Sequence, residues 1–591
     1  MNAHGSGRRG RDIGLISTIK ASCRDCYKCV RSCPVKAIRV TDGHAEVVEE
    51  RCIADGKCVT ICPQHAKKVE SGIPVVKDFL ASRLPVGASV APSFVAVFGS
   101  EFVGRFIAAL KKLGFAYVEE TAEGAEWVAL AHQELVKAGK SPVLTSCCPA
   151  IVNLIKVYYP QLLPYLAPIV SPMVAHGRIM KKRYGAETKI VFIGPCIAKK
   201  GEIKEELPGI DAVLTFTELQ EMLAEEHIDL AVLEEENFDG DRAISAHAFA
   251  APGGLARSAM LSTDLLSDQV VTIDGLEETI EFLNRFAEIK DSLKLVELLA
   301  CRGGCIMGPG MAGEAPVFAR RNRLVSYADQ RLRARGFTEC AFPAITDLKP
   351  TGYLEPKLNR VYQDCGNLGV MPSEDQIKQV LAKTGKFTPA DELNCGACGY
   401  NSCREKAVAV LNNMAEIDMC IPFMRARAES RANLVLKFTP NAIFVVDSDL
   451  KILEVNPAAE KMFQCRQNSV LGKKLSTIMN PKHFEAALNK QGLVTGEVSF
   501  PSYGIIAWQA IFYVKKEDVL IGIFADLTKE KQQRERLALV TGETLEKAQE
   551  VIDKQMRVAQ EIAGLLGETT AETKVLLTKL IKLFQNEDGK A

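Results

Sequence analysis

The sequence has no excess of charge of one sign and no long apolar run. Lysine and arginine together number 73, as do aspartate and glutamate. This balance argues against a partner such as nucleic acid or an anionic membrane surface. No apolar stretch reaches the length of a membrane span, and the N-terminus lacks a signal-peptide core. We therefore expect a cytoplasmic protein with no membrane span and no nucleic-acid partner.

Cysteine, in contrast, is abundant. The 591 residues include 19 cysteines, an odd number, and many of them are closely spaced. Without a secretion signal, this spacing favours reduced thiolates that bind iron over disulfides. The length exceeds what a single hydrophobic core usually serves, so we expect several domains. Residues 1–12, rich in glycine and arginine, predict a disordered arm.

Residues 13–75 predict a two-cluster ferredoxin-like domain that admits electrons. The spacing C-x2-C-x2-C-x3-C followed by proline is typical of bacterial two-cluster ferredoxins, whose fourth cysteine ligates the other cluster. In the second run, Asp55 stands where the pattern has a cysteine. It is either an oxygen ligand or a bystander at an open corner, which gives a 4Fe-4S or a 3Fe-4S cluster. We assign cluster one to Cys23, Cys26, Cys29 and Cys62, and cluster two to Cys33, Cys52, Cys58 and Asp55.

Three separated stretches within residues 76–389 carry the next set of cysteines. They are 145–149, 195–202 and 300–305, and together they offer enough thiolates for one cubane. Three such motifs in this order closely resemble the H-cluster site of the FeFe hydrogenases. The resemblance implies a 4Fe-4S cube linked to a two-iron centre that carries CO, cyanide and a dithiolate bridge. The implied ligands are Cys148, Cys196, Cys301 and Cys305.

The same resemblance implies roles for the side chains around this cluster. Cys147 matches the proton-relay cysteine of the family, and Lys199 matches the lysine that hydrogen-bonds a cyanide, with Glu202 orienting it. Pro92 and Ser93 match the loop that faces the other cyanide. The plainer alternatives are a small buried residue for Cys147 and a solvated helix start for Lys199.

Other positions depart from the catalytic members of the family. Gly194 and Leu299 replace methionines beside the two-iron centre, and Met173 replaces a polar residue. Phe249 is expected either to wall the cavity or to belong to the ordinary core.

The proton path of the family is also altered. On an ungapped alignment its serine falls on Ala167 and its acidic residues fall on Trp127 and Leu130. None of these side chains can carry a proton, so the relay would stop beyond Cys147 unless water or another acid, such as Glu126, replaces them. We therefore expect slow turnover, since each ~1.4 kcal/mol of added barrier lowers the rate tenfold.

The remaining pattern of residues 76–389 predicts an α/β domain. Apolar runs at 90–98, 189–193 and 212–216 predict buried strands, and helical patterns at 151–158 and 219–224 lie between them. Strands that alternate with helices place a site at the strand ends.

Residues 390–425 predict a further cluster. Cysteines spaced C-x2-C-x4-C are followed by another seventeen positions later, and the helical segment 404–415 would bring it back to the loop. The motif resembles the small 4Fe-4S domain found beside some sensory hydrogenases, and zinc bound by four thiolates is the alternative. The ligands would be Cys395, Cys398, Cys403 and Cys420.

The C-terminal third predicts a sensor module and a helical tail. Strand patterns at 442–447, 452–455, 505–513 and 519–526 look like a PAS domain over residues 426–530. Residues 531–591 follow with apolar residues at heptad steps, which indicates either a dimeric coiled coil or one helix packed on its own PAS domain. The fold class is thus multidomain, α/β and α+β.

Three functional hypotheses follow. The first is a sensory FeFe hydrogenase that slowly oxidises H2 and signals through its PAS domain and tail. The second is a ferredoxin-linked catalytic hydrogenase with a regulatory PAS tail, and the third is a non-catalytic iron-sulfur scaffold. The expected partners are H2 and protons, a redox protein such as ferredoxin, hydrogenase maturation proteins, a second copy of the chain, and a separate kinase or phosphatase as output.

Overall fold

The computed structural model describes residues 14–205, 207–240, 243–261, 269–337, 354–365, 371–565 and 570–586, without the side chains of 431–432, 563–565, 570–573 and 583–586. The chain divides into two compact units, Met1–Met424 and Arg425–Ala591. The predicted disordered arm, 1–12, lies outside the described residues.

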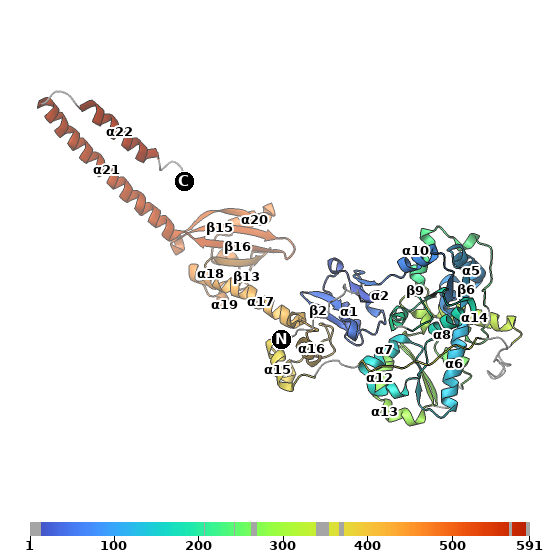
Figure 1. Cartoon of the computed structure of the whole chain (residues 1–591). Helices are drawn as coiled ribbons and strands as arrows, with labels where there is room; N and C mark the ends of the chain where they lie inside the picture. The colour runs from blue at the N-terminus through green and yellow to red at the C-terminus, as the bar shows by residue number, and fades with distance from the viewer. Residues whose placement is uncertain are drawn as a thin grey trace, which may run out of the picture. The chain divides into compact units, whose positions relative to one another are not determined.

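The N-terminal part of the first unit has two similar halves, each with a short helix beside a pair of strands. Both helices begin after a left-handed residue, Tyr27 (φ 53°) or Gly56 (φ 74°), which turns the cysteine loop into the helix. These elements share one apolar core with the larger domain that follows, next to which Figure 1 shows them in blue. They are β1 (Ile16–Thr18) paired with β4 (Lys67–Val69), β2 (Ile38–Thr41) paired with β3 (His44–Val47), α1 (Lys28–Ser32) and α2 (Lys57–Thr60).

Two parallel sheets form the larger domain. Because helices cover both faces of a parallel sheet, its strands are largely buried, and every residue of β5 (Val86–Val90) and β11 (Leu295–Leu299) is buried. One sheet has the order β6-β5-β8-β9 and the other the order β10-β11-β7. The other strands are β6 (Tyr117–Glu120), β7 (Val143–Leu144), β8 (Lys189–Gly194), β9 (Ala212–Thr215) and β10 (Val270–Asp274).

Helices lie between and beyond these strands along the chain. They are α3 (Ile73–Ala81), α4 (Val95–Phe98), α5 (Val103–Lys112), α6 (Ala122–Lys137), α7 (Pro149–Tyr158), α8 (Pro172–Tyr184), α9 (Ala198–Glu202), α10 (Phe216–Glu225), α11 (Gly254–Ser258), α12 (Leu276–Asn284), α13 (Phe286–Ile289) and α14 (Val317–Ala334).

One predicted strand is wrong. Residues 90–98 were expected to be extended, but β5 ends at Val90 and the chain continues as a 3-10 helix, Pro92–Phe94, and then α4. Proline at the first helical position favours this change because its fixed φ suits a helix start and its missing N–H costs nothing there. The strands and helices predicted around 189–193, 212–216, 151–158 and 219–224 are confirmed.

No single described helix is long and apolar enough to cross a membrane. One bent pair, 92–98 with 100–112, meets the length and hydropathy criteria together. Within that pair, Phe94, Phe106 and Ile107 are buried in the core of the larger domain.

The last part of the first unit is small. Here α15 (Glu374–Lys383), which lies within the range predicted for the preceding domain, packs against α16 (Cys403–Leu411) through a core of four buried side chains. Helix α17 (Ile421–Phe438) then begins one residue after Cys420.

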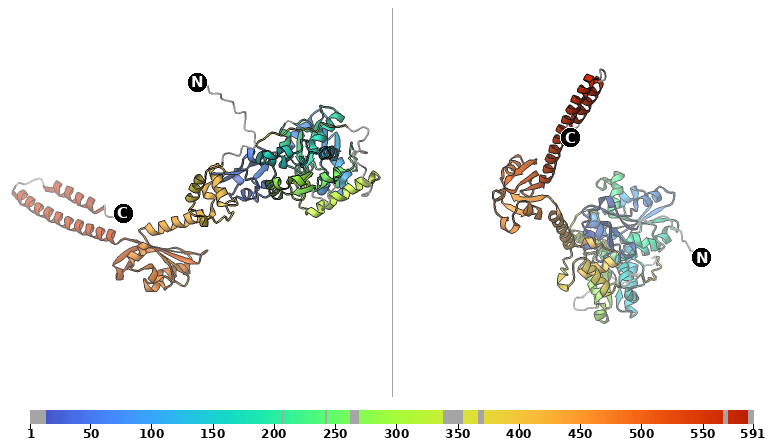
Figure 2. Two further views of the ribbon diagram at one scale, coloured as in Figure 1. Left: turned by 90° about the horizontal axis from the view of Figure 1, so that it is seen from below. Right: turned by 90° about the vertical axis from the view of Figure 1, so that its left-hand side faces the viewer.

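The second unit contains an antiparallel sheet of order β13-β12-β16-β15-β14, as expected of a PAS fold. Its core is aromatic, with Phe463 and Phe524 in contact at 5.7 Å between ring centroids. After β16 the chain continues as the long helix α21, seen in Figure 2. The elements are β12 (Ala442–Asp447), β13 (Ile452–Val455), α18 (Pro457–Met462), α19 (Gln467–Val470), α20 (Lys482–Lys490), β14 (Val494–Phe500), β15 (Ile505–Val514), β16 (Val519–Asp526), α21 (Thr528–Leu565) and α22 (Thr570–Asn586).

Candidate metal centres

One cavity gathers the four cysteines that the sequence assigns to the H-cluster. They follow the carboxyl ends of β7 and β11, which belong to one parallel sheet, and of β8, which belongs to the other, so the strand ends of both sheets meet at this cavity. The volume of the cavity is about 100 Å³. Its sulfur-bearing lining consists of Cys147, Cys148, Cys196, Cys301 and Cys305.

The metal-free thiols of this cavity are poor acids. Burial raises the pKa of Cys196 to about 11 and that of Cys305 to about 12, and it raises the pKa of Cys301 well above its usual value. All eighteen cysteines within the described ranges are free thiols. Because iron binds thiolates, assembly of a cluster here must release these protons.

A buried ionic network lies behind the cavity wall. Lys199 Nζ donates to Glu202 Oε2 at 2.8 Å and to the Cys147 carbonyl at 3.4 Å. The other carboxylate oxygen of Glu202 accepts from Arg360 Nη1 at 3.1 Å, and Ser171 Oγ donates to Oε2 at 3.0 Å. Lys199 lines the cavity, whereas Glu202 orients it from behind. The solvated alternative for Lys199 therefore does not hold, because both members of the pair are buried.

Ser93 and Pro92 line the same cavity. The hydroxyl of Ser93 is fully buried and has no hydrogen-bond partner among the described residues. An unpaired buried hydroxyl is unfavourable unless a ligand supplies the acceptor. A cationic Lys199 on one wall and an unpaired donor on another fit a bound group that carries anionic ligands.

The remaining predicted contacts also lie on the wall of the cavity. Met173, Phe249 and Leu299 line it, which favours the wall role for Phe249. Gly194 does not line it. A Cβ at Gly194 would lie 2.6 Å from the ring of Phe192, and that ring, which sequence reasoning missed, lines the cavity in its place.

The positions matched to the proton path of the family are absent from the lining. Ala167 is buried in the core, and the indole N–H of Trp127 is buried without a described partner. Leu130 is half-buried on α6. The carboxylate of Glu126 accepts backbone N–H groups from Ile244 and Ser245, so it caps a loop and does not face the cavity.

A second polar network begins at the cavity and was not anticipated. Thr121 lines the cavity, and its hydroxyl lies 2.8 Å from Ser89 Oγ, which lies 2.8 Å from His176 Nδ1. His176 Nε2 lies 3.2 Å from Glu119. Arg183 pairs with Glu119, which supplies the buried countercharge. Spacing gave no signal for this network, because its members lie on β5, β6 and α8 and in the turn before α6.

Four family models match parts of the chain. The model for the iron only hydrogenase large subunit, C-terminal domain, covers residues 85–309, and that for a 4Fe-4S dicluster domain covers 15–63. An Fe-S cluster model covers 391–422 and the PAS fold covers 425–541. The periplasmic Fe hydrogenase large subunit of Nitratidesulfovibrio vulgaris is 30% identical over 370 residues, which are 50% of this chain and 86% of that protein. The chain belongs to the iron-only hydrogenase family.

Two further proteins are similar to parts of this hydrogenase homologue. The cytosolic Fe-S cluster assembly factor NAR1 of Yarrowia lipolytica is 26% identical over 195 residues, which are 28% of this chain and 40% of that protein. A variant of the FeFe-hydrogenase HydA1 from Chlamydomonas reinhardtii matches in structure with 20% identity and a TM-score of 0.39, and the match covers 50% of this chain and all of that one. The predicted family and fold class are confirmed.

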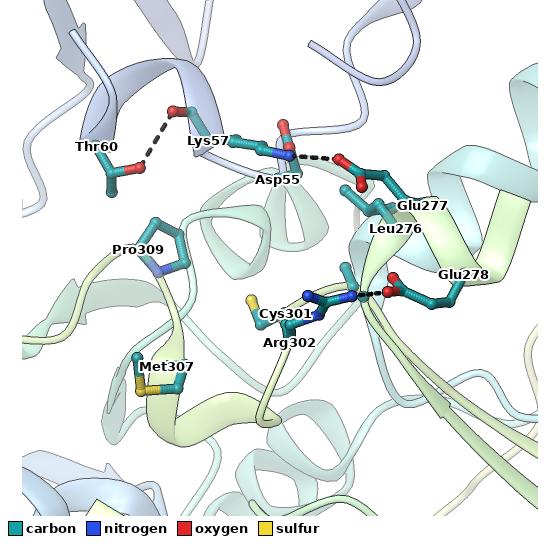
Figure 3. Close-up of a pocket in the computed structure, with 12 residues that line it drawn as sticks. Asp55, Lys57, Thr60, Leu276, Glu277, Glu278, Cys301, Arg302, Met307 and Pro309 are labelled. Carbon is teal, nitrogen blue, oxygen red and sulfur yellow. Dashed lines mark hydrogen bonds and ion pairs between the residues drawn. The ribbon is translucent and has the colours of Figure 1, made fainter. Parts of the chain in front are cut away.

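The second ferredoxin-type site of the hydrogenase homologue lies next to the H-cluster cavity. Figure 3 shows Asp55 and Cys301 on the wall of one pocket. Burial raises the pKa of Asp55 to about 6, and one of its carboxylate oxygens is buried without a described partner. Asp55 also raises the pKa of Cys33 and Cys58, which places it among the predicted ligands of cluster two. An unpaired buried carboxylate oxygen fits a metal ligand.

Backbone N–H groups point at the sulfurs of both ferredoxin-type sites of the homologue. The amide of Ala66 donates to Cys62 Sγ at 3.3 Å, and equivalent bonds reach Cys33 and Cys52. Such bonds stabilise thiolate ligands and help to set the potential of a cluster. At cluster one the thiols of Cys23 and Cys26 both act on the pKa of Cys29, so these three predicted ligands lie together.

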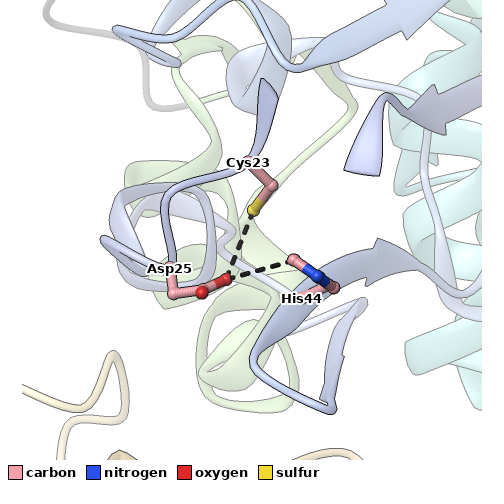
Figure 4. A group of neighbouring side chains, drawn as sticks. All are labelled: Cys23, Asp25 and His44. Carbon is pink, nitrogen blue, oxygen red and sulfur yellow. Dashed lines mark hydrogen bonds and ion pairs between the residues drawn. The ribbon is translucent and has the colours of Figure 1, made fainter. Parts of the chain in front are cut away.

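A carboxylate missed by sequence reasoning also lies beside cluster one. Asp25 lies between Cys23 and His44, as Figure 4 shows, with its Oδ1 3.6 Å from the sulfur and 3.5 Å from His44 Nδ1. These groups are partly or fully exposed.

The four cysteines predicted for the fourth cluster line one cavity of the homologue, as their spacing required. The side chains of Lys386 and Lys406 line it too. The adjoining loop contacts the ferredoxin-like domain, since Arg31 donates to the Ala397 carbonyl at 3.0 Å and Lys36 donates to the Gly399 carbonyl at 2.8 Å. The sulfur ligands of the cavity are Cys395, Cys398, Cys403 and Cys420.

Proposed function

We propose that this member of the iron-only hydrogenase family is a cytoplasmic sensory FeFe hydrogenase that binds H2 and oxidises it slowly and reversibly. The observation that carries this proposal is the cavity in which four cysteine thiols, the Lys199 cation and the unpaired Ser93 hydroxyl converge. Cys148, Cys196, Cys301 and Cys305 would hold the H-cluster, which would supply the chemistry that converts H2 into two protons and two electrons.

The residues of the chain supply binding, orientation and proton transfer. Cys147 Sγ holds and passes the proton, since a thiol beside the cluster can both donate and accept it. Lys199 Nζ and Ser93 Oγ donate hydrogen bonds to the anionic ligands of the group, and Glu202 fixes the position of Lys199. The apolar wall, which includes Phe249, keeps water out and strengthens these interactions.

The protein also offers a route for electrons. Asp55 of the second ferredoxin-type site and Cys301 of the H-cluster site share a pocket, and the fourth-cluster loop rests on the ferredoxin-like domain through Arg31 and Lys36. Electrons released at the H-cluster would therefore reach the fourth cluster through the two ferredoxin-type clusters, or leave to a redox protein such as ferredoxin.

Signalling belongs to the second unit in this proposal. The redox state of the clusters is read by the PAS domain and passed through α21 and α22 in a homodimer to a separate kinase or phosphatase. Hydrogenase maturation proteins supply the two-iron centre. The slow turnover is attributed to the non-ionisable side chains of Trp127, Leu130 and Ala167.

A second candidate is a non-catalytic iron-sulfur scaffold, which the similarity to the assembly factor NAR1 favours. In that case the four cysteines would hold a cluster without the two-iron centre, and Lys199 would have no cyanide to bind. The third candidate, a ferredoxin-linked catalytic hydrogenase, differs from the proposal only in its turnover.

Infrared spectroscopy of the matured full chain, titrated with H2, tests the proposal when H2 oxidation is measured on the same sample. We expect bands from CO and cyanide that shift with H2, together with low turnover. Cys305→Ser should abolish the bands, whereas the control Cys365→Ser, at an exposed free thiol, should retain them. The absence of bands would support the scaffold, and high turnover would support a catalytic hydrogenase.

A further inference from the structure

Two lysine side chains are buried in the cavity of the fourth cluster. Lys386 is 8% exposed and Lys406 is 5% exposed, although lysine is almost never buried unless it is paired. They come from different elements, since Lys386 follows α15 and Lys406 lies on α16. Both line the cavity that the four cysteines line.

The hydrogen bonds of the two ammonium groups do not fully neutralise their positive charge. Lys386 Nζ lies 3.5 Å from Cys420 Sγ and otherwise donates to the carbonyl and hydroxyl oxygens of Thr384. Lys406 Nζ donates to the Ile417 carbonyl at 2.7 Å, and the Asp418 carboxylate gives its charge only a weaker compensation than the cysteines of the cavity do. Carbonyl and hydroxyl oxygens satisfy hydrogen bonds but do not neutralise a cation, and burying an uncompensated cation is costly. An anionic cluster held by four thiolates in the same cavity supplies the missing negative charge.

We infer that Lys386 and Lys406 raise the reduction potential of the fourth cluster, so that it is the site where an electron from H2 comes to rest. Reduction adds one negative charge to a cluster that is already anionic. A buried cation a few ångströms away therefore stabilises the reduced form more than the oxidised form, because the two charges attract strongly where little water screens them. Net charge and hydrogen bonds to the sulfurs are among the factors that set the potential of an iron-sulfur cluster.

The position of the fourth cluster suits the proposed sensor. The biological purpose that we infer for this cluster rests on that proposed function. Cys420, the sulfur ligand that Lys386 contacts, is the residue before α17, and its carbonyl accepts the Met424 amide in the first turn of that helix. Helix α17 continues to Phe438, and the first PAS strand begins at Ala442. A change of charge at Cys420 thus occurs at the start of the segment that connects the clusters to the sensor module.

The test is a redox titration of the cluster-loaded full chain followed by electron paramagnetic resonance. Lys386→Met and Lys406→Met keep much of the side-chain volume and remove the charge. The matched control is Lys383→Met, at an exposed position of α15. At a fixed potential near the midpoint, each buried variant should show at least a tenfold lower ratio of reduced to oxidised fourth cluster than the control, which corresponds to a midpoint about 59 mV lower.

Lys386→Arg, which retains the charge, should stay near the midpoint of the unmodified chain. Iron content and circular dichroism of each variant establish that the fourth cluster is assembled. Midpoints of both methionine variants that equal that of the control would overturn the inference, as would zinc in place of iron. In this titration redox mediators, and not H2, set the potential. A chain that fails to react with H2 would therefore refute the proposed function without affecting the measured midpoints.

Discussion

Glu202→Gln provides a sharp test of the ionic network behind the cavity. The substitution keeps the shape of the side chain but removes the only negative charge that contacts both Lys199 and Arg360 among the described residues at this point. All three side chains are buried. The variant therefore leaves two cations in a poorly solvated interior, one of which, Arg360, retains Glu205 as a partial compensation.

The stability that Glu202→Gln is expected to lose follows from the burial of the ion pair. Removing one partner of a buried ion pair costs about 3–5 kcal/mol, because the remaining charge is uncompensated. Since Arg360 keeps Glu205, we expect the lower end, about 3 kcal/mol, which equals a change of roughly a hundredfold in an opening equilibrium. Glu205→Gln is the matched control. The Glu205 side chain is 33% exposed, and without it the buried Arg360 would still keep Glu202 as its countercharge, so the removal of Glu205 should cost about 1 kcal/mol or less.

Hydrogen exchange measured by mass spectrometry is suited to this comparison, because it reports local opening in a protein of several domains. Amides of α8 and α9, which carry or adjoin the network, should exchange roughly a hundredfold faster in Glu202→Gln than in the unmodified chain, and less than about tenfold faster in Glu205→Gln. Equal exchange in the two variants would refute the view that Glu202 is the central countercharge.

Three further outcomes are expected. Burial alone would raise the pKa of Glu119, but His176 and Arg183 outweigh burial and lower the pKa from 4.5 to about 2. The ionised Glu119 therefore contributes about 3 kcal/mol to the free energy of unfolding above pH 4.5, and this contribution is lost as the pH falls towards 2. Acid unfolding of Glu119→Gln should lack that part of the pH dependence, and an unchanged slope would contradict the assignment. Asp55→Cys should slow the loss of iron from cluster two to a chelator, because a thiolate is the softer ligand, and equal rates of bleaching would show that Asp55 is a bystander. Cys147→Ser should lower H2 oxidation by about 100-fold or more while the infrared bands persist; retained turnover would exclude Cys147 as the relay.

The sequence alone predicted the fold class and the cluster motifs well, for a local reason. Within a ferredoxin run or the C-x2-C-x4-C loop, neighbouring ligands are separated by so few residues that the backbone must wrap the cluster. Apolar runs such as 189–193 likewise predict buried parallel strands, because helices cover both faces of such a sheet. The run 90–98 shows the limit of this reasoning, since a proline at 92 converts the second half of an equally apolar segment into helix.

Contacts between distant parts of the chain were decided only by the tertiary structure. Arg360 contacts Glu202 across 158 positions of the sequence, and Lys386 contacts Cys420 across 34. At such separations no sequence spacing predicts that a lysine or an arginine will meet its partner. Short-range spacing thus predicted the ligands of the two ferredoxin-type clusters and of the fourth cluster, whereas the cysteines of the H-cluster cavity come from three separated stretches. Long-range packing decided which charges surround the iron, because burial and countercharge depend on what the folded chain brings together from elsewhere.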